Sequence, residues 1–185
     1  MKSKNLNELL EKIDSLHKTY IATRGIIQYI NEDKIGKSEL KWGSNINSEW
    51  VDIQFNFKQQ ISIEIRNELN RISESINQNF IIRLHSLLDY EGIKNGKSLI
   101  DKSIEGFEMI EIIHFLRKQF AHRHGNFDLN DIDSIKTRER LFKDFNIEHY
   151  ESLPNQFPLD KNRVILPIVN GTKKYVSGYW NKHEK

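Results

Sequence analysis

The chain has 185 residues, of which 37% are apolar and 29% are charged, a composition typical of an ordinary globular protein. It contains no cysteine, which excludes a disulfide framework, a thiol nucleophile and a zinc site built from cysteines. The 28 Lys and Arg residues against 26 Asp and Glu leave a net charge of +2, too small for overall charge to indicate a nucleic-acid partner. Any such partner must be recognised by a local basic patch.

The sequence shows no targeting or membrane-spanning pattern. Its opening segment, MKSKNLNELLEKIDSLHK, has scattered charges and no apolar run of signal-peptide length. The longest apolar stretch, Val164 to Val169, is interrupted by Pro167 and is too short to cross a bilayer. We therefore expect a cytoplasmic protein without a membrane partner. At this length one hydrophobic core is the default, so a single domain over residues 1–185 is predicted.

The first third of the chain contains one clear element and two less regular ones. Apolar residues at helical spacing predict an amphipathic helix over about residues 4–31. Residues 31–49 are polar, contain two glycines and show no periodicity, so they are predicted to form a surface loop. Residues 51–57 alternate apolar and polar as a strand does, yet they lead into a helical pattern, which leaves strand and helix both open.

Two further helices have stronger patterns. The clearest periodicity in the chain predicts a helix over residues 57–91, which ends before Gly92 and forms the spine of the core. A third helix is predicted over residues 103–124, with Ser103 as its N-cap and Gly125 at its end.

The last third allows two more helices. Residues 134–146 suit a short helix. Beyond them, Asn170-Gly171 suits a hairpin turn, but the neighbouring apolar residues keep helical spacing and Pro167 suits a first helical turn. The balance favours a C-terminal helix over about residues 167–181. Taken together, these elements predict an all-α bundle of four to five helices.

The polar groups most suggestive of a site lie in FLRKQFAHRHG, residues 115–125. Arg117 is a permanent cation whose planar guanidinium matches phosphate oxygens, and His122 or His124 can exchange protons near neutral pH. Lys118 and Arg123 add positive charge for binding RNA phosphates. These groups are typical of a metal-independent ribonuclease, in which a histidine moves a proton and a guanidinium stabilises the charge that develops on phosphorus.

This segment resembles the HEPN domains (higher eukaryote and prokaryote nucleotide-binding), all-α proteins whose signature is an Arg followed, after four to six residues, by a His. Arg117 and His122 have four residues between them, LRKQFAHRHG is similar to that family's usual LRN..AHG stretch, and RLHSLLDYEGI in the preceding helix is similar as well. The resemblance covers about residues 55–125. It implies a homodimer in which two copies form one composite endoribonuclease site that needs neither metal nor cofactor.

Carried over to this chain, the resemblance implies that Arg117 and His122 are catalytic and that RNA is cut to leave a 2',3'-cyclic phosphate. It also suggests a role as a toxin or a phage-defence effector, with an antitoxin or defence-system partner. The alternative is a non-catalytic HEPN module that binds RNA, nucleotide or a partner such as a nucleotidyltransferase antitoxin. Lys118 favours that alternative, because active members often have Asn at this position.

The spacing leaves open which histidine works with Arg117. On a straight helix, residues five apart are separated by about 140° around the axis. Either the helix breaks before His122, or the site is shared across a dimer, or His124 is the working histidine. A simpler interpretation makes Arg117 a helix-end cation paired with Glu111 or a neighbouring carboxylate.

The other histidines have structural interpretations. His85 and His114 lie beside apolar stripes and are interpreted as partly buried structural residues. A metal site formed by His114, His122 and His124 is disfavoured, because helical spacing spreads the three around the axis.

Overall fold

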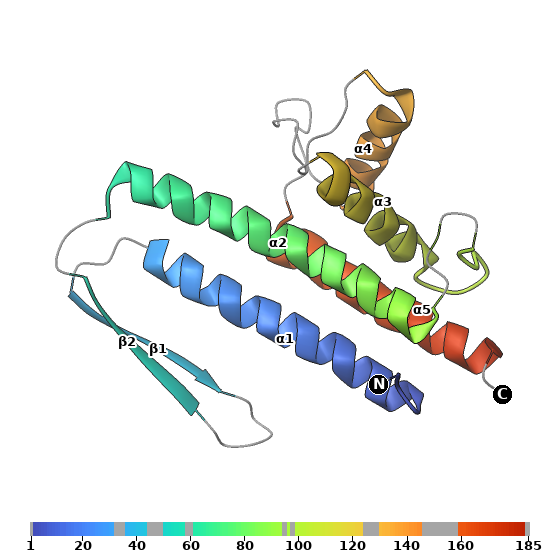
Figure 1. Ribbon diagram of the computed structural model, residues 1–185, viewed down its shortest axis with the longest axis horizontal. Coiled ribbons are helices and arrows are strands. Elements are labelled where there is room, and N and C mark those ends of the chain that lie inside the picture. Colours follow the sequence, from blue (N-terminus) through green and yellow to red (C-terminus); the bar gives the residue numbers. More distant parts are fainter. Residues whose placement is uncertain are drawn as a thin grey trace. The chain divides into compact units, whose positions relative to one another are not determined.

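The computed structural model describes residues 2–31, 36–43, 50–57, 61–93, 96, 99–123, 130–145 and 159–183. The elements, in chain order, are α1 (Leu6–Asn31), β1 (Gly36–Gly43), β2 (Trp50–Phe57), α2 (Ile63–Glu91), α3 (Phe107–Arg123), α4 (Ile132–Asp144), η2 (Lys161–Ile165) and α5 (Leu166–His183) (Figure 1). The helices confirm the predicted helical bundle. The chain divides into two compact units, residues 18–77 and residues 1–17 with 78–185, and each is described by itself. The single domain over 1–185 stays a prediction.

The unit of residues 18–77 contains an antiparallel pair of strands that the sequence did not predict as a pair. β1 lies within the segment 31–49 that was predicted to be a loop, and that prediction is wrong for residues 36–43. β2 settles the open choice at residues 51–57 in favour of strand. The register places Leu40 opposite Ile53 and Trp42 opposite Val51, whereas Phe55 lies opposite Ser38 and Phe57 opposite Gly36.

The second helix begins later than predicted. Its ladder of apolar residues extends back to residue 57, but residues 50–57 belong to β2 and α2 begins at Ile63. The hydroxyl oxygen of Ser62 accepts a hydrogen bond from the backbone N–H of Ile65 at 3.3 Å, which satisfies one of the donors left over at the start of a helix.

The first turns of α2 do not form the spine of a core. Ile65 is 55% exposed and Ile72 is 41% exposed, although both belong to the predicted ladder. The buried groups in this part of the helix include polar Asn77, whose amide oxygen accepts a hydrogen bond from the hydroxyl of Tyr20 at 3.1 Å. The periodicity therefore predicted the helix correctly but not which of its turns are buried.

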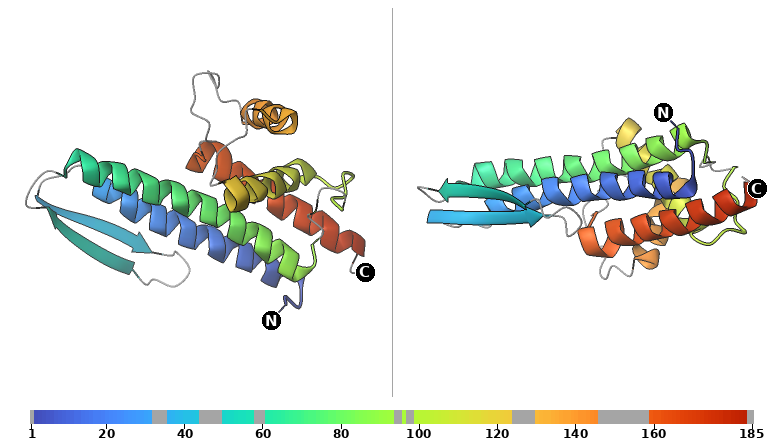
Figure 2. Two further views of the ribbon diagram at one scale, coloured as in Figure 1. Left: turned by 45° about the horizontal axis from the view of Figure 1, so that its top comes forward. Right: turned by 90° about the horizontal axis from the view of Figure 1, so that it is seen from below.

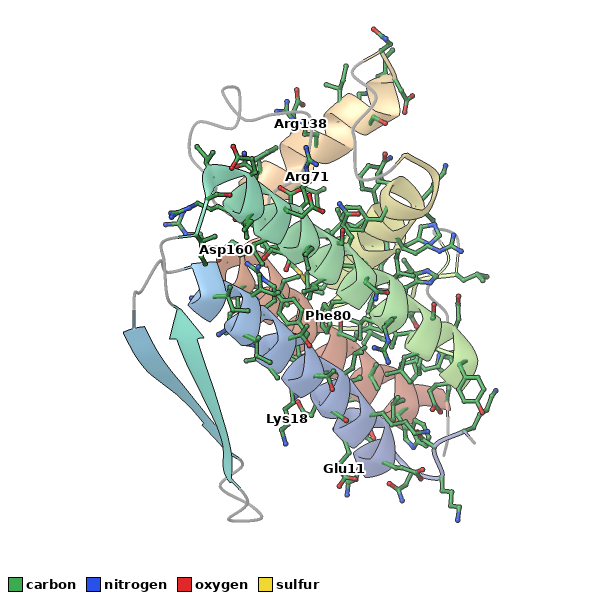
Figure 3. All side chains as sticks on the ribbon, turned by 60° about the vertical axis from the view of Figure 1, so that its left-hand side comes forward. Glu11, Lys18, Arg71, Phe80, Arg138 and Asp160 are labelled. Atoms are coloured by element: carbon green, nitrogen blue, oxygen red, sulfur yellow. The ribbon has the colours of Figure 1, made fainter. Side chains whose placement is uncertain are left out.

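The core of the other unit is formed by α1 up to residue 17, α2 from residue 78, α3 and α5. Phe80, labelled in Figure 3, is buried there, with its ring centroid 6.1 Å from that of His17. The stripes predicted for α1, α3 and the later part of α2 supply most of this core. The fully buried residues include Leu9, Ile13, Ile81, Leu84, Leu88, Ile110, Ile113, Leu116, Ile168 and Val176.

The C-terminal segment is a helix, as favoured, and the hairpin alternative is wrong. α5 extends from Leu166 to His183 and is continuous with the π-helical turn η2. The Asp160 carboxylate begins this segment by accepting hydrogen bonds from the backbone N–H groups of Asn162 at 2.8 Å and Arg163 at 2.7 Å.

Glycines allow α5 to lie against the start of α3 (Figure 2). A Cβ atom at Gly171 would overlap the Met109 side chain, and one at Gly178 would lie 2.6 Å from Cγ2 of Ile104. Gly106 has a φ of 90°, and a Cβ there would collide with the Gly171 carbonyl. The close approach explains why a helix contains two residues of low helix propensity.

α3 begins at Phe107, so Ser103 is not its N-cap as predicted. Ser103 lies in the preceding turn, where its backbone N–H and its hydroxyl donate to the Asp101 carboxylate at 3.0 and 2.7 Å. Lys182 of α5 donates to the same carboxylate at 2.5 Å. α4 begins two residues earlier than predicted, with Asp131 as its N-cap. Gly125 lies outside the described residues.

Candidate functional site

The helix α3 carries most of the residues that the sequence marked for chemistry. It is continuous from Phe107 to Arg123, so no break precedes His122. Along this helix Arg117 and His122 are therefore separated by about 140° around the axis. The side chains of His122 and Arg123, and all of His124, lie outside the described residues.

Arg117 does not have the partner that the simple interpretation gave it. The Glu111 carboxylate forms an ion pair with Lys102, with 3.0 Å between nitrogen and oxygen. Within the part of the chain that the structure describes, Arg117 makes no hydrogen bond or ion pair, although its side chain is half-buried. Lys118, the next residue, is exposed. A guanidinium in this state retains its donors for an anion from outside the described residues.

The structure brings Arg117 together with two histidines that the sequence analysis left without chemistry. His114 is three residues before Arg117 on α3, about 60° away around the helix axis. His85 of α2 is 5% exposed, and its Nε2 lies 3.4 Å from Nδ1 of His114. The two imidazole rings have their centroids 5.6 Å apart and are tilted by 36°.

A carboxylate completes this cluster at its α2 end. Oδ2 of Asp89 lies 3.3 Å from Nδ1 of His85, four residues earlier on α2, and the Asp89 side chain is 58% exposed. The row Asp89, His85, His114 thus connects water to the interior of the α2–α3 contact. We call Asp89, His85, His114 and Arg117 the α2–α3 polar cluster.

Burial governs the charge of His85. Burial is the largest effect and lowers the pKa of His85. The Asp89 carboxylate raises this pKa, and positive charge at Arg117 and His114 lowers it. The resulting pKa of His85 is below its ordinary value. His85 is therefore neutral at neutral pH, and its contact with Asp89 is then not an ion pair.

The sequence contained only a weak signal for this cluster. His85 and Asp89 are four residues apart and so share a helix face, and His114 and Arg117 are three apart. Neither pair stands out among the many polar pairs of a helical protein. Their meeting depends on how α2 packs against α3, a contact between residues 29 positions apart.

Metal-binding groups and membrane-spanning helices are both absent from the described residues. In the described ranges, no group of three or more His, Cys, Asp or Glu side chains is arranged to hold a metal ion. No helix among the described residues combines the length and the apolar character needed to cross a membrane. Comparisons with protein-family models, curated proteins and solved structures found no significant match for this chain.

Proposed function

We propose that this chain is a metal-independent endoribonuclease of the HEPN type that acts as a homodimer. The 2'-hydroxyl oxygen of a ribose attacks the adjacent phosphorus, a histidine moves the proton, and the 5'-oxygen leaves with a proton of its own. The products are a 2',3'-cyclic phosphate and a 5'-hydroxyl. Arg117 stabilises the charge that develops on the phosphoryl oxygens.

The observation that carries this proposal is the state of Arg117. The Arg117 side chain is half-buried, makes no hydrogen bond or ion pair within the described residues, and lies on the helix that bears the Arg-x4-His motif. A guanidinium without a protein partner keeps its donors for an anion. A phosphodiester provides oxygens that match the guanidinium in geometry and in charge.

The continuity of α3 favours a shared site. Because positions 117 and 122 are separated by about 140° around the axis of one helix, we infer that the two residues of a single copy do not act on one phosphate. A second copy supplies the missing histidine when two α3 ends face each other. His124 is the second choice for the working histidine, and Lys118 with Arg123 binds the flanking phosphates.

The setting that we propose follows from the same resemblance. An unregulated ribonuclease is toxic to its own cytoplasm, so we place the chain in a toxin–antitoxin or phage-defence system with a protein partner that restrains it. The second candidate function is a non-catalytic module that binds RNA, nucleotide or such a partner. The exposed Lys118 immediately after Arg117 favours it, because a cation there binds phosphate without chemistry.

The test is cleavage of a mixed labelled RNA, in EDTA, by purified wild type and the variants Arg117→Ala, Lys118→Ala, His122→Ala and His124→Ala. We expect loss of cleavage by about 10²- to 10³-fold in Arg117→Ala and in one histidine variant, with cyclic-phosphate ends from the wild type. Lys118→Ala serves as the matched cation control, with weaker binding and little change in kcat.

Folding and oligomeric state are measured beside cleavage. The thermal melting of Arg117→Ala should stay close to that of the wild type, since Arg117 has no partner to lose among the described residues. Absence of cleavage by folded, dimeric wild type, with retained RNA binding that needs Arg117, would move the assignment to the binding module.

A further inference from the structure

One stripe of α2, in the unit of residues 18–77, is apolar and open to water. Ile65 is 55% exposed and Ile72 is 41% exposed, and Leu69 and Ile76 in the same row are half-buried. These four positions lie within about 60° of one another around the helix axis. Their spacing of four, three and four residues is that of a coiled-coil seam, which is a surface for packing against another helix.

The face of α2 that packs within this unit is a different one. Ser73 and Asn77 are buried, and the amide oxygen of Asn77 accepts a hydrogen bond from the hydroxyl of Tyr20 of α1 at 3.1 Å. These two positions lie about 90° around the helix axis from the centre of the stripe. The contact with α1 thus leaves Ile65 and Ile72 exposed, and burial against a further helix would remove their apolar surface from water.

The charges of this part of α2 favour a protein as the occupant of the stripe. Residues 63–77 carry three acidic and two basic side chains, a net charge of −1: Glu64, Glu68 and Glu74 against Arg66 and Arg71. A helix that binds a lipid surface typically has Lys and Arg along its polar face, and nucleic acid is bound through a surplus of cations. Neither condition is met here.

We propose that the stripe of Ile65, Leu69, Ile72 and Ile76 is a self-association surface, which packs antiparallel against the same stripe of a second copy of this chain. A two-fold axis between positions 70 and 71 sets each Ile65 opposite an Ile76 and each Leu69 opposite an Ile72, the layers of an antiparallel coiled coil. This inference goes beyond the proposed function, because it needs neither RNA nor the Arg117 site.

The charges beside the stripe complement one another in this arrangement. Glu68 and Arg71 have side chains that are 62% and 78% exposed, with 3.4 Å between Oε2 and Nη1, and Arg71 is labelled in Figure 3. Antiparallel pairing sets Glu68 of one copy within about 3 Å, measured along the axis, of the level of Arg71 of the other. In a parallel pairing each Glu68 would instead lie at the level of the other Glu68. Opposite charges therefore favour the antiparallel arrangement.

The first experiment measures self-association of the full chain by sedimentation equilibrium from about 1 to about 300 µM, the range of weak interfaces. We expect a dimer whose Kd rises at least about tenfold in Ile65→Glu/Ile72→Glu, since charges replace apolar side chains in both copies. Ile63→Glu is the matched control. Ile63 is 69% exposed and lies about 150° around α2 from the stripe, so its Kd should equal that of the wild type. Circular dichroism and urea unfolding check that each variant folds.

Charge reversal tests the register of the two helices. Glu68→Arg and Arg71→Glu should each raise the Kd about threefold, because each places like charges across the two-fold axis. The double variant Glu68→Arg/Arg71→Glu restores opposite charges within the helix and between the copies, so its Kd should return to that of the wild type. A double variant that associates no better than the single variants would overturn the antiparallel register.

Cysteine pairing tests the orientation directly, because the chain has no cysteine of its own. Under oxidation, Ile65→Cys and Ile76→Cys should form a disulfide-linked dimer when the two variants are mixed, and little of it when each is alone. Efficient linking of Ile65→Cys to itself would overturn the antiparallel arrangement. A wild type that stays monomeric, or an Ile65→Glu/Ile72→Glu variant that associates as the wild type does, would overturn the surface. A chain that associates through this stripe but cleaves no RNA would overturn the proposed function alone.

Discussion

α3 has two contacts in the same unit that are made in different ways. Against α5 the backbones approach closely at Gly106 and Gly171, and polar groups beside this contact have partners, such as Lys174 with Glu105 at 2.6 Å. Against α2 it places His114 beside His85, with Arg117 unpaired among the described residues. The first contact is optimised for packing, and the second accepts polar groups that a core normally avoids.

The difference teaches where to look for chemistry. Buried polar groups cost stability unless they are fully hydrogen-bonded, so a contact that keeps titratable groups has a cost that packing does not explain. We therefore expect the α5 contact of α3 to contribute mainly to stability and the α2–α3 polar cluster to contribute less.

The largest expected effect comes from breaking the closely packed contact. Gly171→Val places a branched side chain where Cβ already overlaps Met109, and the backbones of α3 and α5 must separate. We expect the free energy of unfolding in urea to fall by about 3 kcal/mol. Cleavage per folded molecule, measured in the cold, should change little, because the polar cluster is on the other contact.

Gly25→Val is the matched control for this variant. Gly25 also lies inside a helix, but a Cβ atom there would meet nothing within 4 Å. Valine has the higher helix propensity, so the free energy of unfolding should stay the same or rise by a few tenths, about 0.5 kcal/mol. Equal losses in the two variants would mean that the close approach of α5 does not matter.

A smaller effect is expected from replacing the buried histidine by an apolar side chain. In His85→Leu, Asp89 is already 58% exposed and stays solvated. We expect the free energy of unfolding to change by about 1 kcal/mol or less, in either direction. A loss of stability comparable to that of Gly171→Val would assign His85 to the scaffold and remove the contrast.

The helices could be predicted from sequence because each depends on residues close together in the chain. The apolar residues of α3 recur every three or four positions, and Ile110, Ile113 and Leu116 are fully buried as that spacing requires. β2 was left open because an alternating segment followed by a helical ladder satisfies both periods until a partner strand is present.

The site could be predicted only in part, because some of its residues meet only through the packing of α2 against α3. Arg117 stands in a local motif and was found. The contact of His85 with His114 joins α2 to α3, and no local pattern predicts it. Gly171 suggested a turn, but it lies inside α5. Its low helix propensity is offset by a close contact with α3, which the spacing within α5 does not reveal.

The smallest expected effect is a pH dependence of stability that sharpens the same contrast. The pKa of His85 is lowered in the folded chain, first by burial, so the unfolded chain binds more protons once the pH drops towards the ordinary histidine value. The free energy of unfolding should therefore decrease as the pH falls below about 6.5, and should keep decreasing until His85 is protonated in the folded chain.

His85→Leu removes this titration, so its stability should decline less than that of the wild type over the acid range. His17, whose pKa is also lowered by burial, with Lys173 and Lys161 adding to the effect and Asp14 opposing it, keeps its own share in both proteins. Urea unfolding of the two proteins across this pH range measures the difference. Parallel curves would mean that His85 is protonated as readily in the folded chain as in water, and the α2–α3 polar cluster would not hold a neutral His85.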